Sequence, residues 1–296
     1  MAVIPLHSKE HVELLPFGDF ESWTVRYIKE SKLIGGKTKA LYMVGPNDTI
    51  YGNEAYIPSS LSPWGTGNAH AKAFGFDKVS VSVRPDRHNG GLCCRMETIL
   101  EVISAVGIDL KALAAGSLYT GCLLDPVGLK QGSDPVSSID MGVPYTRRPK
   151  ALMLDYKAFI QPHGQVIYAD AGTRIKNVDG HDEGQITLIL QYRWEENGHI
   201  YAYRVGTAYE SICASTDGWQ NDHRIPIHYE PFGQLATRRF KARNSQGEMV
   251  YVEECDFRGD ITPTHMILQI CSGNQPPFIG CPGNIVWCDN IRIIYP

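Results

Sequence analysis

Short stretches in which apolar and polar positions alternate recur along this chain. In Ala151–Phe159, successive residues point to opposite sides of an extended strand, and both sides are partly apolar. This pattern is typical of a central strand in a sandwich, with one side on the core and the other on a concave surface. Similar patterns predict further strands at Gln185–Trp194, His199–Val205, Met249–Asp256, His265–Cys271 and Asn284–Tyr295.

Turn residues separate these strands and predict how neighbouring strands connect. Asn197-Gly198 lies between two strand patterns, and this dipeptide favours the two-residue turn of a β-hairpin. The stretch Arg95–Leu113 is ambiguous, because its apolar residues recur with helical spacing although it is rich in β-branched residues and contains Gly107. A helix and a strand-turn-strand unit both fit this stretch.

The composition narrows the fold. Hydrophobic residues make up 43% of the 296 residues, so the chain can bury a core. The 29 glycines and 18 prolines are spread along the chain, as in proteins whose turns join many short strands. The eight cysteines include no CxxC pair, so we expect small buried side chains rather than a zinc site. We therefore expect an all-β architecture.

The charge pattern argues against nucleic-acid and membrane partners. Lys and Arg number 28 and Asp and Glu 32, which gives a net charge of −4, and there is no basic stripe. No apolar run approaches the roughly 20 residues of a transmembrane helix. The first residues do not read as a signal peptide, so we expect either an intracellular protein or one whose targeting segment has been removed.

Five segments carry a resemblance to a known family: Gly18–Trp23, Leu92–Thr98, Ala114–Gly121, Gly142–Lys150 followed by Asp155–Lys157, and Trp287–Tyr295. In order and spacing they resemble the putative carbohydrate metabolism domain of gut-bacterial polysaccharide-utilisation systems. The resemblance implies one domain, residues 14–296, with the fold of a jelly-roll-like β-sandwich of antiparallel strands and long loops. Residues 1–13, which precede the first of these segments and have mixed charge, are expected to form an N-terminal tail. The resemblance also implies glycan binding beside other envelope glycan-utilisation proteins, at the cell surface, in the periplasm or outside the cell.

The two chain ends also resemble those of jelly-roll carbohydrate-binding modules, which hold a structural calcium ion where the ends meet. Ca²⁺ is bound by oxygen ligands, and Glu21, Asp289 and Asn290 would supply side-chain oxygens. The alternative is that these residues lie in turns or edge strands and bond to water or backbone amides.

Candidate sugar-binding residues are aromatic side chains in loops, because pyranose rings stack on flat apolar faces while polar groups pair with their hydroxyls. Trp64, with Asn68 in the same loop, and Trp219 lie among turn residues, which predicts exposure. Packing of both loops is the alternative. Arg147 could hold a uronic-acid or sulfate group or simply lie in a solvated loop. The tryptophans on strand patterns are expected in the core: Trp23, Trp194 and Trp287.

Catalysis is a second hypothesis. A glycoside hydrolase needs two carboxylates on either side of one glycosidic bond, and the candidates on strand patterns are Asp155, Glu253 and Asp256. With 32 acidic residues in the chain, such pairs arise easily by chance. A third hypothesis is a structural adhesin or assembly subunit. Clustered exposed aromatic side chains would favour binding, a buried acid pair in a cleft would favour hydrolysis, and a flat apolar patch would favour assembly.

Overall fold

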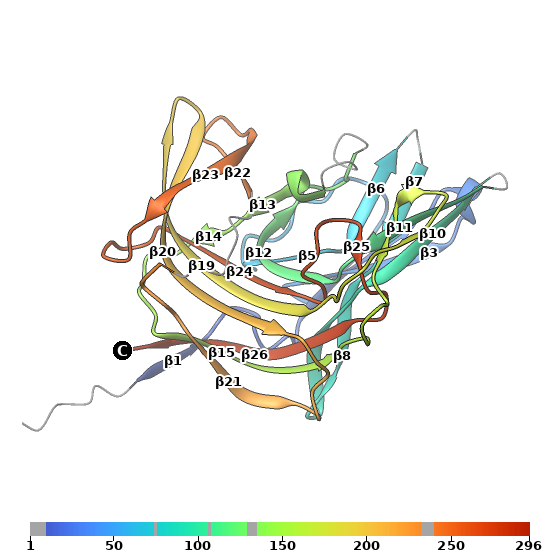
Figure 1. The fold of residues 1–296 in the computed structure, drawn as a ribbon. Coiled ribbons are helices and arrows are strands. Elements are labelled where there is room, and N and C mark those ends of the chain that lie inside the picture. The colour runs from blue at the N-terminus through green and yellow to red at the C-terminus, as the bar shows by residue number, and fades with distance from the viewer. Residues whose placement is uncertain (1–9, 74–75, 106–107, 129–134, 232–239) are drawn as a thin grey trace, which may run out of the picture.

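Two facing β-sheets form the body of the protein (Figure 1). The computed structural model describes residues 10–73, 76–105, 108–128, 135–231 and 240–296. Besides strands, these ranges contain two short 3-10 helices, η1 (Lys32–Ile34) and η2 (Pro135–Ser138). No helix in the described ranges has the length and apolar character needed to cross a membrane. The predicted all-β class is confirmed.

The smaller sheet has six strands, all paired antiparallel, in the order β21-β15-β26-β9-β8, with β1 beside β26. β1 pairs with the end of β26, so that His11 lies opposite Tyr295 and the two ends of the described chain meet (Figure 1). The strands of this sheet are β1 (His11–Leu14), β8 (Val83–His88), β9 (Gly91–Glu97), β15 (Ala151–Phe159), β21 (Gln220–Pro226) and β26 (Ile285–Tyr295).

The larger sheet has nine strands and curls on itself, because β12 pairs with both β13 and β24. Two of its pairings, β20 with β23 and β13 with β22, are parallel, and the others are antiparallel. In sheet order its strands are β14 (Val143–Pro144), β24 (His265–Cys271), β19 (Gly184–Glu196), β20 (His199–Ile212), β23 (Met249–Phe257), β22 (Lys241–Arg243), β13 (Ile139–Met141), β12 (Ser117–Leu123) and β5 (Trp64–Thr66).

Four small sheets extend the sandwich at the end drawn on the right of Figure 1 and around its rim. One contains β2 (Trp23–Lys29), β3 (Thr38–Val44) and β4 (Asp48–Tyr51), and another β6 (Ala69–Ala73) and β7 (Phe76–Ser80). The third contains β10 (Ile99–Ala105), β11 (Ile108–Ala114) and β17 (Asp170–Gly172). The fourth contains β16 (Ile167–Tyr168), β18 (Lys176–Asn177) and β25 (Ile279–Gly280).

The main core lies between the two large sheets. β15 and β26 send Leu152, Leu154 and Val286 into it, and β19 sends Leu188 and Leu190 from the other side. Each of these side chains is fully buried, and burying a side chain of this size stabilises the fold by about 1.5–3 kcal/mol. Since each strand alternates, the side chains between these inward positions face away from the core. The predicted β-sandwich is confirmed.

The described residues of the ambiguous stretch Arg95–Leu113, which exclude 106–107, form strands rather than a helix. β9, β10 and β11 run through it, and β10 pairs with β11 as a hairpin. The predicted hairpin at Asn197-Gly198 is confirmed, because Glu196 lies opposite His199 and both turn residues have positive φ. All eight cysteines, which lie within the described ranges, are free, and five are buried. Cys213 and Cys255, in contrast, are exposed.

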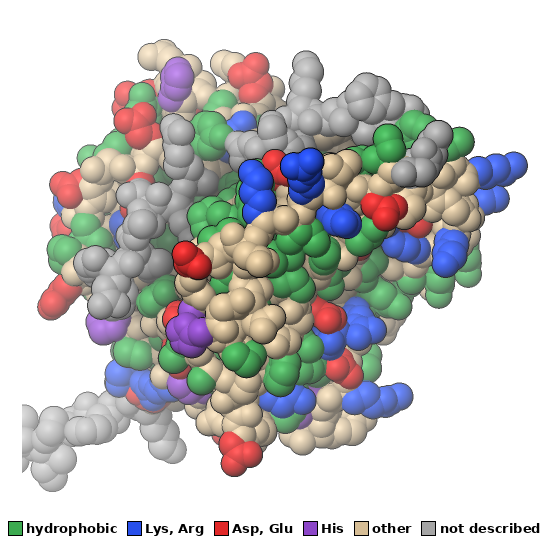
Figure 2. Space-filling model, turned by 45° about the vertical axis from the view of Figure 1, so that its right-hand side comes forward, with side chains coloured by type: hydrophobic (Ala, Val, Ile, Leu, Met, Phe, Trp, Pro, Cys, Tyr) green, Lys and Arg blue, Asp and Glu red, His purple; other side chains and the backbone are tan. Residues whose placement is uncertain are grey.

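Acidic and basic side chains are interspersed with hydrophobic ones on the face drawn in Figure 2. This mixed distribution differs from the single-sign basic surface that binds nucleic acid.

Candidate functional site

The outward-facing side of the smaller sheet carries a group of aromatic and charged side chains. On β15, Leu154 and Tyr156 point into the core, so Asp155, Lys157 and Phe159 point outward. Phe159 is 47% exposed although it is large and apolar. This side of the sheet therefore differs from an ordinary polar outer surface.

One row of side chains crosses four neighbouring strands. The strand registers place Lys157 opposite Trp287, Trp287 opposite Arg95, and Arg95 opposite Arg84. Because adjacent strands lie about 4.8 Å apart, this row spans about 14 Å, more than one sugar ring. We call Lys157, Trp287, Arg95 and Arg84 the tryptophan–cation row.

Two cations of this row, Lys157 and Arg95, lie near the ring of Trp287. The Lys157 Nζ lies 4.2 Å from the centre of the Trp287 ring, and the Arg95 guanidinium lies 5.6 Å from it. The indole Nε1–H donates a 2.8 Å hydrogen bond to Asp86 Oδ2. Cation–π contacts of this kind fix the ring and the ammonium relative to each other. Trp287 is half-buried, so part of its ring remains accessible.

Trp219 lies over one end of the row. It directly precedes β21, and its ring stacks on His88 with the centroids 3.7 Å apart and the planes inclined by 20°. The Lys157 Nζ lies 5.6 Å from the Trp219 ring. Lys157 is therefore flanked by two tryptophans that lie 68 residues apart in the sequence. In the described part of the chain, the only ring that stacks on Trp219 is that of His88.

Two buried carboxylates, those of Asp289 and Asp155, contact the residues that position Trp219. Asp289 Oδ2 lies 2.6 Å from His88 Nδ1, beneath Trp219. Asp155 Oδ1 accepts the backbone N–H of Asp222 at 2.7 Å, which fixes the segment that follows Trp219. Burial raises the pKa of Asp289 because it disfavours the charged carboxylate, and the hydrogen bond from His88 opposes this rise.

A groove of about 440 Å³ opens beside the other end of the row. Its wall includes Arg84 and Arg95 from the smaller sheet and Lys39 and Tyr42 from β3. Ligand-binding pockets commonly enclose about 300–1,000 Å³. The row and the groove together form one extended surface, with the indole rings of Trp219 and Trp287 at one end and the groove beside Arg84 at the other. Such a surface is chemically suited to a sugar chain, whose rings stack on indoles and whose substituents pair with cations.

Four of the residues that the sequence predicts to be functional meet here, although for different predicted roles. They are Trp219, Asp155, Asp289 and Asn290, and Asn290 Nδ2 donates a 2.8 Å hydrogen bond to Asp155 Oδ2. Trp287 was expected in the core, and that prediction is wrong. Its inward neighbours on β26, Val286 and Cys288, are both fully buried, so alternation turns Trp287 outward.

Trp64 and Asn68 were expected to be exposed, and both are 4% exposed. Trp64 packs against Phe20 and donates its indole N–H to the Pro16 carbonyl at 2.8 Å. The Asn68 side chain bonds the backbone of Tyr42 and of residues 82–83, so it joins strands rather than a ligand. The Gly- and Pro-rich segment around Trp64 can be buried because the Asn68 amide forms hydrogen bonds with backbone groups that would otherwise bond to water.

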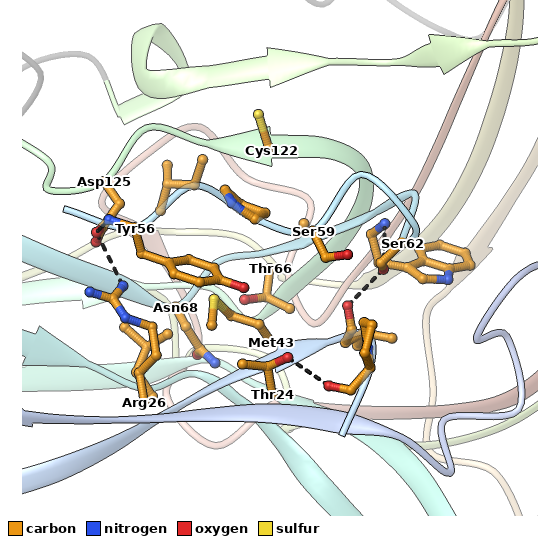
Figure 3. Close-up of a pocket in the computed structure, with 18 residues that line it drawn as sticks. Thr24, Arg26, Met43, Tyr56, Ser59, Ser62, Thr66, Asn68, Cys122 and Asp125 are labelled. Atoms are coloured by element: carbon orange, nitrogen blue, oxygen red, sulfur yellow. Dashed lines mark hydrogen bonds and ion pairs between the residues drawn. The ribbon is translucent and has the colours of Figure 1, made fainter. Parts of the chain in front are cut away.

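Trp64 and Asn68 line a small cavity between β2, β3 and β5 (Figure 3). The cavity measures about 50 Å³, room for a water molecule but not for a sugar. Its polar wall is a buried ion pair in which Arg26 Nη1 lies 3.1 Å from Asp125 Oδ2. The ring of Tyr56 faces the same guanidinium at 5.0 Å. This cavity is therefore a packing feature.

Trp194 is half-buried rather than a core residue. It lies near the turn of the β19–β20 hairpin, where its ring stacks on Tyr201 at 5.6 Å and lies 4.7 Å from Tyr203. These rings cover one another's faces, which leaves them less available for stacking a sugar than Trp219.

The remaining predicted residues lie elsewhere. Arg147 forms an ion pair with Glu13 and covers the Tyr295 ring at 3.5 Å, so its charge is already paired. Glu253 and Asp256 are exposed on β23 of the larger sheet, whereas Asp155 is on the smaller sheet. The structure does not bring the three predicted catalytic carboxylates together.

The predicted calcium ligands are bonded to other protein groups. Glu21 Oε1 accepts the backbone N–H of Leu92 at 2.9 Å, and Asp289 contacts His88. Within the described ranges, no three His, Cys, Asp or Glu side chains gather as a metal site. Calcium bound by Glu21, Asp289 and Asn290 stays a prediction.

The sequence and the fold place the chain in a class of carbohydrate-related β-sandwich proteins. The model of the family described as "Putative carbohydrate metabolism domain" matches residues 38–243, and the chain belongs to this family. The resemblance seen in the sequence is thus confirmed. No curated protein sequence matches the chain.

Solved structures similar to this fold include two bacterial proteins described as putative glycoside hydrolases. The one from Bacteroides thetaiotaomicron VPI-5482 is 18% identical, with 92% of this chain and 71% of that chain covered and a TM-score of 0.52. The one from Bacteroides vulgatus ATCC 8482 is 14% identical, with coverages of 95% and 94% and a TM-score of 0.46. A carbohydrate-binding module specific for non-crystalline cellulose is 12% identical, with coverages of 81% and 94% and a TM-score of 0.29. The first match agrees with the β-sandwich fold.

Proposed function

We propose that this protein binds a glycan on the outer face of its smaller sheet, with Trp219 and Trp287 as the stacking residues. The observation that carries this proposal is the position of these two indoles on either side of Lys157, on one accessible face that leads to the groove. The name of the family supports a carbohydrate ligand.

The site is largely preorganised. His88 supports one face of Trp219, while Lys157, Arg95 and the hydrogen bond to Asp86 hold Trp287. A ring that is already fixed loses little freedom when a sugar stacks on it, so more of the contact energy appears as affinity.

A glycan array of plant, host and microbial polysaccharides, followed by calorimetry on the tightest ligand, tests this proposal. Trp219→Ala and Trp287→Ala should each weaken binding about tenfold or more, because each removes a stacking face. Trp194→Ala is the matched control, since it also removes a half-buried tryptophan. Its affinity for the glycan should stay within about twofold of the wild-type value. Equal affinity in all three variants and the wild type would refute the proposal.

Hydrolysis is the second candidate, because Asp155 and Asp289 lie opposite each other on β15 and β26. Cβ atoms of opposed residues are about 4.5–5.5 Å apart, close to the spacing of carboxyl groups in retaining glycosidases. However, Asp155 is 6% exposed and Asp289 5%, and the oxygens of both contact protein donors. Binding is therefore better supported. Release of reducing ends from the bound glycan, abolished by Asp155→Asn, would favour hydrolysis.

A further inference from the structure

Two cations of the tryptophan–cation row have no acidic partner. Arg95 pairs with Glu97 at 2.5 Å, and Arg292 on the same face pairs with Asp155 at 3.0 Å and with Asp222 at 2.7 Å. Lys157 and Arg84, in contrast, form no ion pair with any of the described residues. Asp86 lies 3.9 Å from Arg95 and, two residues after Arg84 on β8, on the same side of the sheet. Glu97 and Asp86 thus offset part of the charge of the three cations, and the row carries a surplus positive charge.

The acidic residues around the groove do not neutralise this surplus. Glu97 is held by Arg95, and Glu101 lies 3.1 Å from Lys78 Nζ. Lys39, the third cation of the groove, pairs with Glu30 at 3.3 Å. Arg84 is thus the groove cation that forms no ion pair with a described carboxylate, although Asp86 follows it two residues later on the same side of β8.

Lys157 differs from an ordinary solvated lysine because its ammonium lies between two indoles. Its Nζ is 4.2 Å from the Trp287 ring centre and 5.6 Å from that of Trp219, and the residue is half-buried. A partly desolvated ammonium in a fixed position binds an anion more strongly than one on a mobile, fully hydrated side chain.

On the basis of the proposed function, we propose that the ligand is an anionic glycan whose carboxylate or sulfate groups pair with Lys157 and Arg84. A guanidinium fork matches either anion with two parallel hydrogen bonds, and the ammonium acts as a point charge. The two cations stand three strand spacings apart, about 14 Å. A single sugar unit does not span this distance, so the two anionic groups lie on different units of one chain.

Matched polysaccharide pairs test this inference by affinity electrophoresis and calorimetry. The pairs are dextran with dextran sulfate, and polygalacturonate with its methyl ester. In each pair the charged member should bind at least about tenfold more tightly. Tighter binding of dextran sulfate than of polygalacturonate would identify sulfate as the group recognised, and the reverse order would identify carboxylate. Added NaCl should weaken binding of the charged member while leaving that of the neutral member unchanged.

Variants separate this inference from the proposed function. Lys157→Met keeps the length of the side chain and should remove most of the preference for the charged member, and Arg84→Gln should do the same. The matched control is Lys176→Met, because Lys176 also lies over an aromatic ring, at 5.6 Å from Tyr168, but on another sheet. It should leave the preference unchanged.

Two other results would overturn the inference. If neutral glycans bind in a Trp219-dependent manner and neither Lys157→Met nor Arg84→Gln alters the preference, the charge inference is wrong and glycan binding stands. If neither the charged nor the neutral polysaccharides nor any glycan on the array binds, the proposed function itself fails.

Discussion

The indole ring of Trp219 lies flat on the imidazole of His88, with centroids 3.7 Å apart and planes inclined by 20°. His88 in turn lies 2.6 Å from the buried Asp289. These three residues come from distant parts of the chain, at the end of β8, before β21 and on β26. The position of Trp219 is therefore set by the tertiary fold rather than by its own loop.

Replacing His88 tests whether it positions Trp219. His88→Ala removes both the stacked ring and the partner of Asp289, so we expect weaker glycan binding and a loss of about 1–3 kcal/mol in the free energy of unfolding. His88→Phe keeps a ring under Trp219 and removes the hydrogen bond, so it should lose stability and retain affinity. Calorimetry and urea denaturation measure the two effects. Equal affinity in His88→Ala and the wild type would contradict the positioning role.

Asp155 should matter for stability through the segment that it anchors. Its carboxylate accepts the N–H of Asp222 and pairs with Arg292. Asp155→Ala leaves the Asp222 N–H and the Asn290 amide without their acceptor, while Arg292 keeps its pair with Asp222, and we expect a loss of about 1–3 kcal/mol in urea denaturation. Asp217→Ala, an exposed acidic residue of the same loop, is the control and should change stability by less than about 0.5 kcal/mol. Similar losses for both variants would show that Asp155 is not an anchor.

The buried His70 predicts a pH-dependent contribution to stability. The carboxylates of Asp125 and Asp77, 3.5 and 2.8 Å from its two ring nitrogens, raise the pKa of His70 above its ordinary value. A histidine whose pKa is higher in the folded state stabilises the fold below its unfolded pKa of about 6.5 and loses this contribution as the pH rises through the folded pKa. His70→Gln should therefore cost more stability near pH 5 than near pH 9 in urea denaturation. A cost independent of pH would exclude this contribution.

The tryptophans should separate into structural and surface classes. Trp64→Ala removes a buried ring and its hydrogen bond to Pro16, so we expect a loss of about 3–5 kcal/mol in unfolding free energy. Trp287→Ala removes a half-buried ring, for which about 1–2 kcal/mol is expected. Thermal and urea denaturation of both variants measure this contrast. A larger loss of unfolding free energy for Trp287→Ala than for Trp64→Ala would contradict the assignment of Trp64 to the core and Trp287 to the surface.

The strands were predictable from the sequence where alternation or turn chemistry was local. Ala151–Phe159 and His265–Cys271 are strands over the predicted residues, and the Asn197-Gly198 turn forms the expected hairpin. These features depend on neighbouring residues alone, so no knowledge of the tertiary fold is needed.

The exchange of roles between Trp64 and Trp287 was not predictable in this way. Trp64 is buried because Phe20 and the main chain at Pro16 close over it from far along the chain. A Cβ on the adjacent Gly65 would lie 2.5 Å from the Tyr119 ring. The glycine is therefore required for close packing of this segment against Tyr119, whereas in the sequence it resembles a residue of an exposed loop. Which side of β26 meets the core depends on the facing sheet, and that information is absent from the strand itself.

Indole N–H signals in a proton–nitrogen NMR spectrum test the central claim most directly, because the protein contains only five tryptophans. With the signals assigned through single Trp→Phe variants, the tightest-binding oligosaccharide is titrated into the wild-type protein. The account predicts that the signals of Trp219 and Trp287 shift together and saturate at one stoichiometry, while those of Trp23, Trp64 and Trp194 stay in place. If only the Trp194 signal shifts, or if the signals of Trp219 and Trp287 both stay in place, a glycan site on the outer face of the smaller sheet is contradicted.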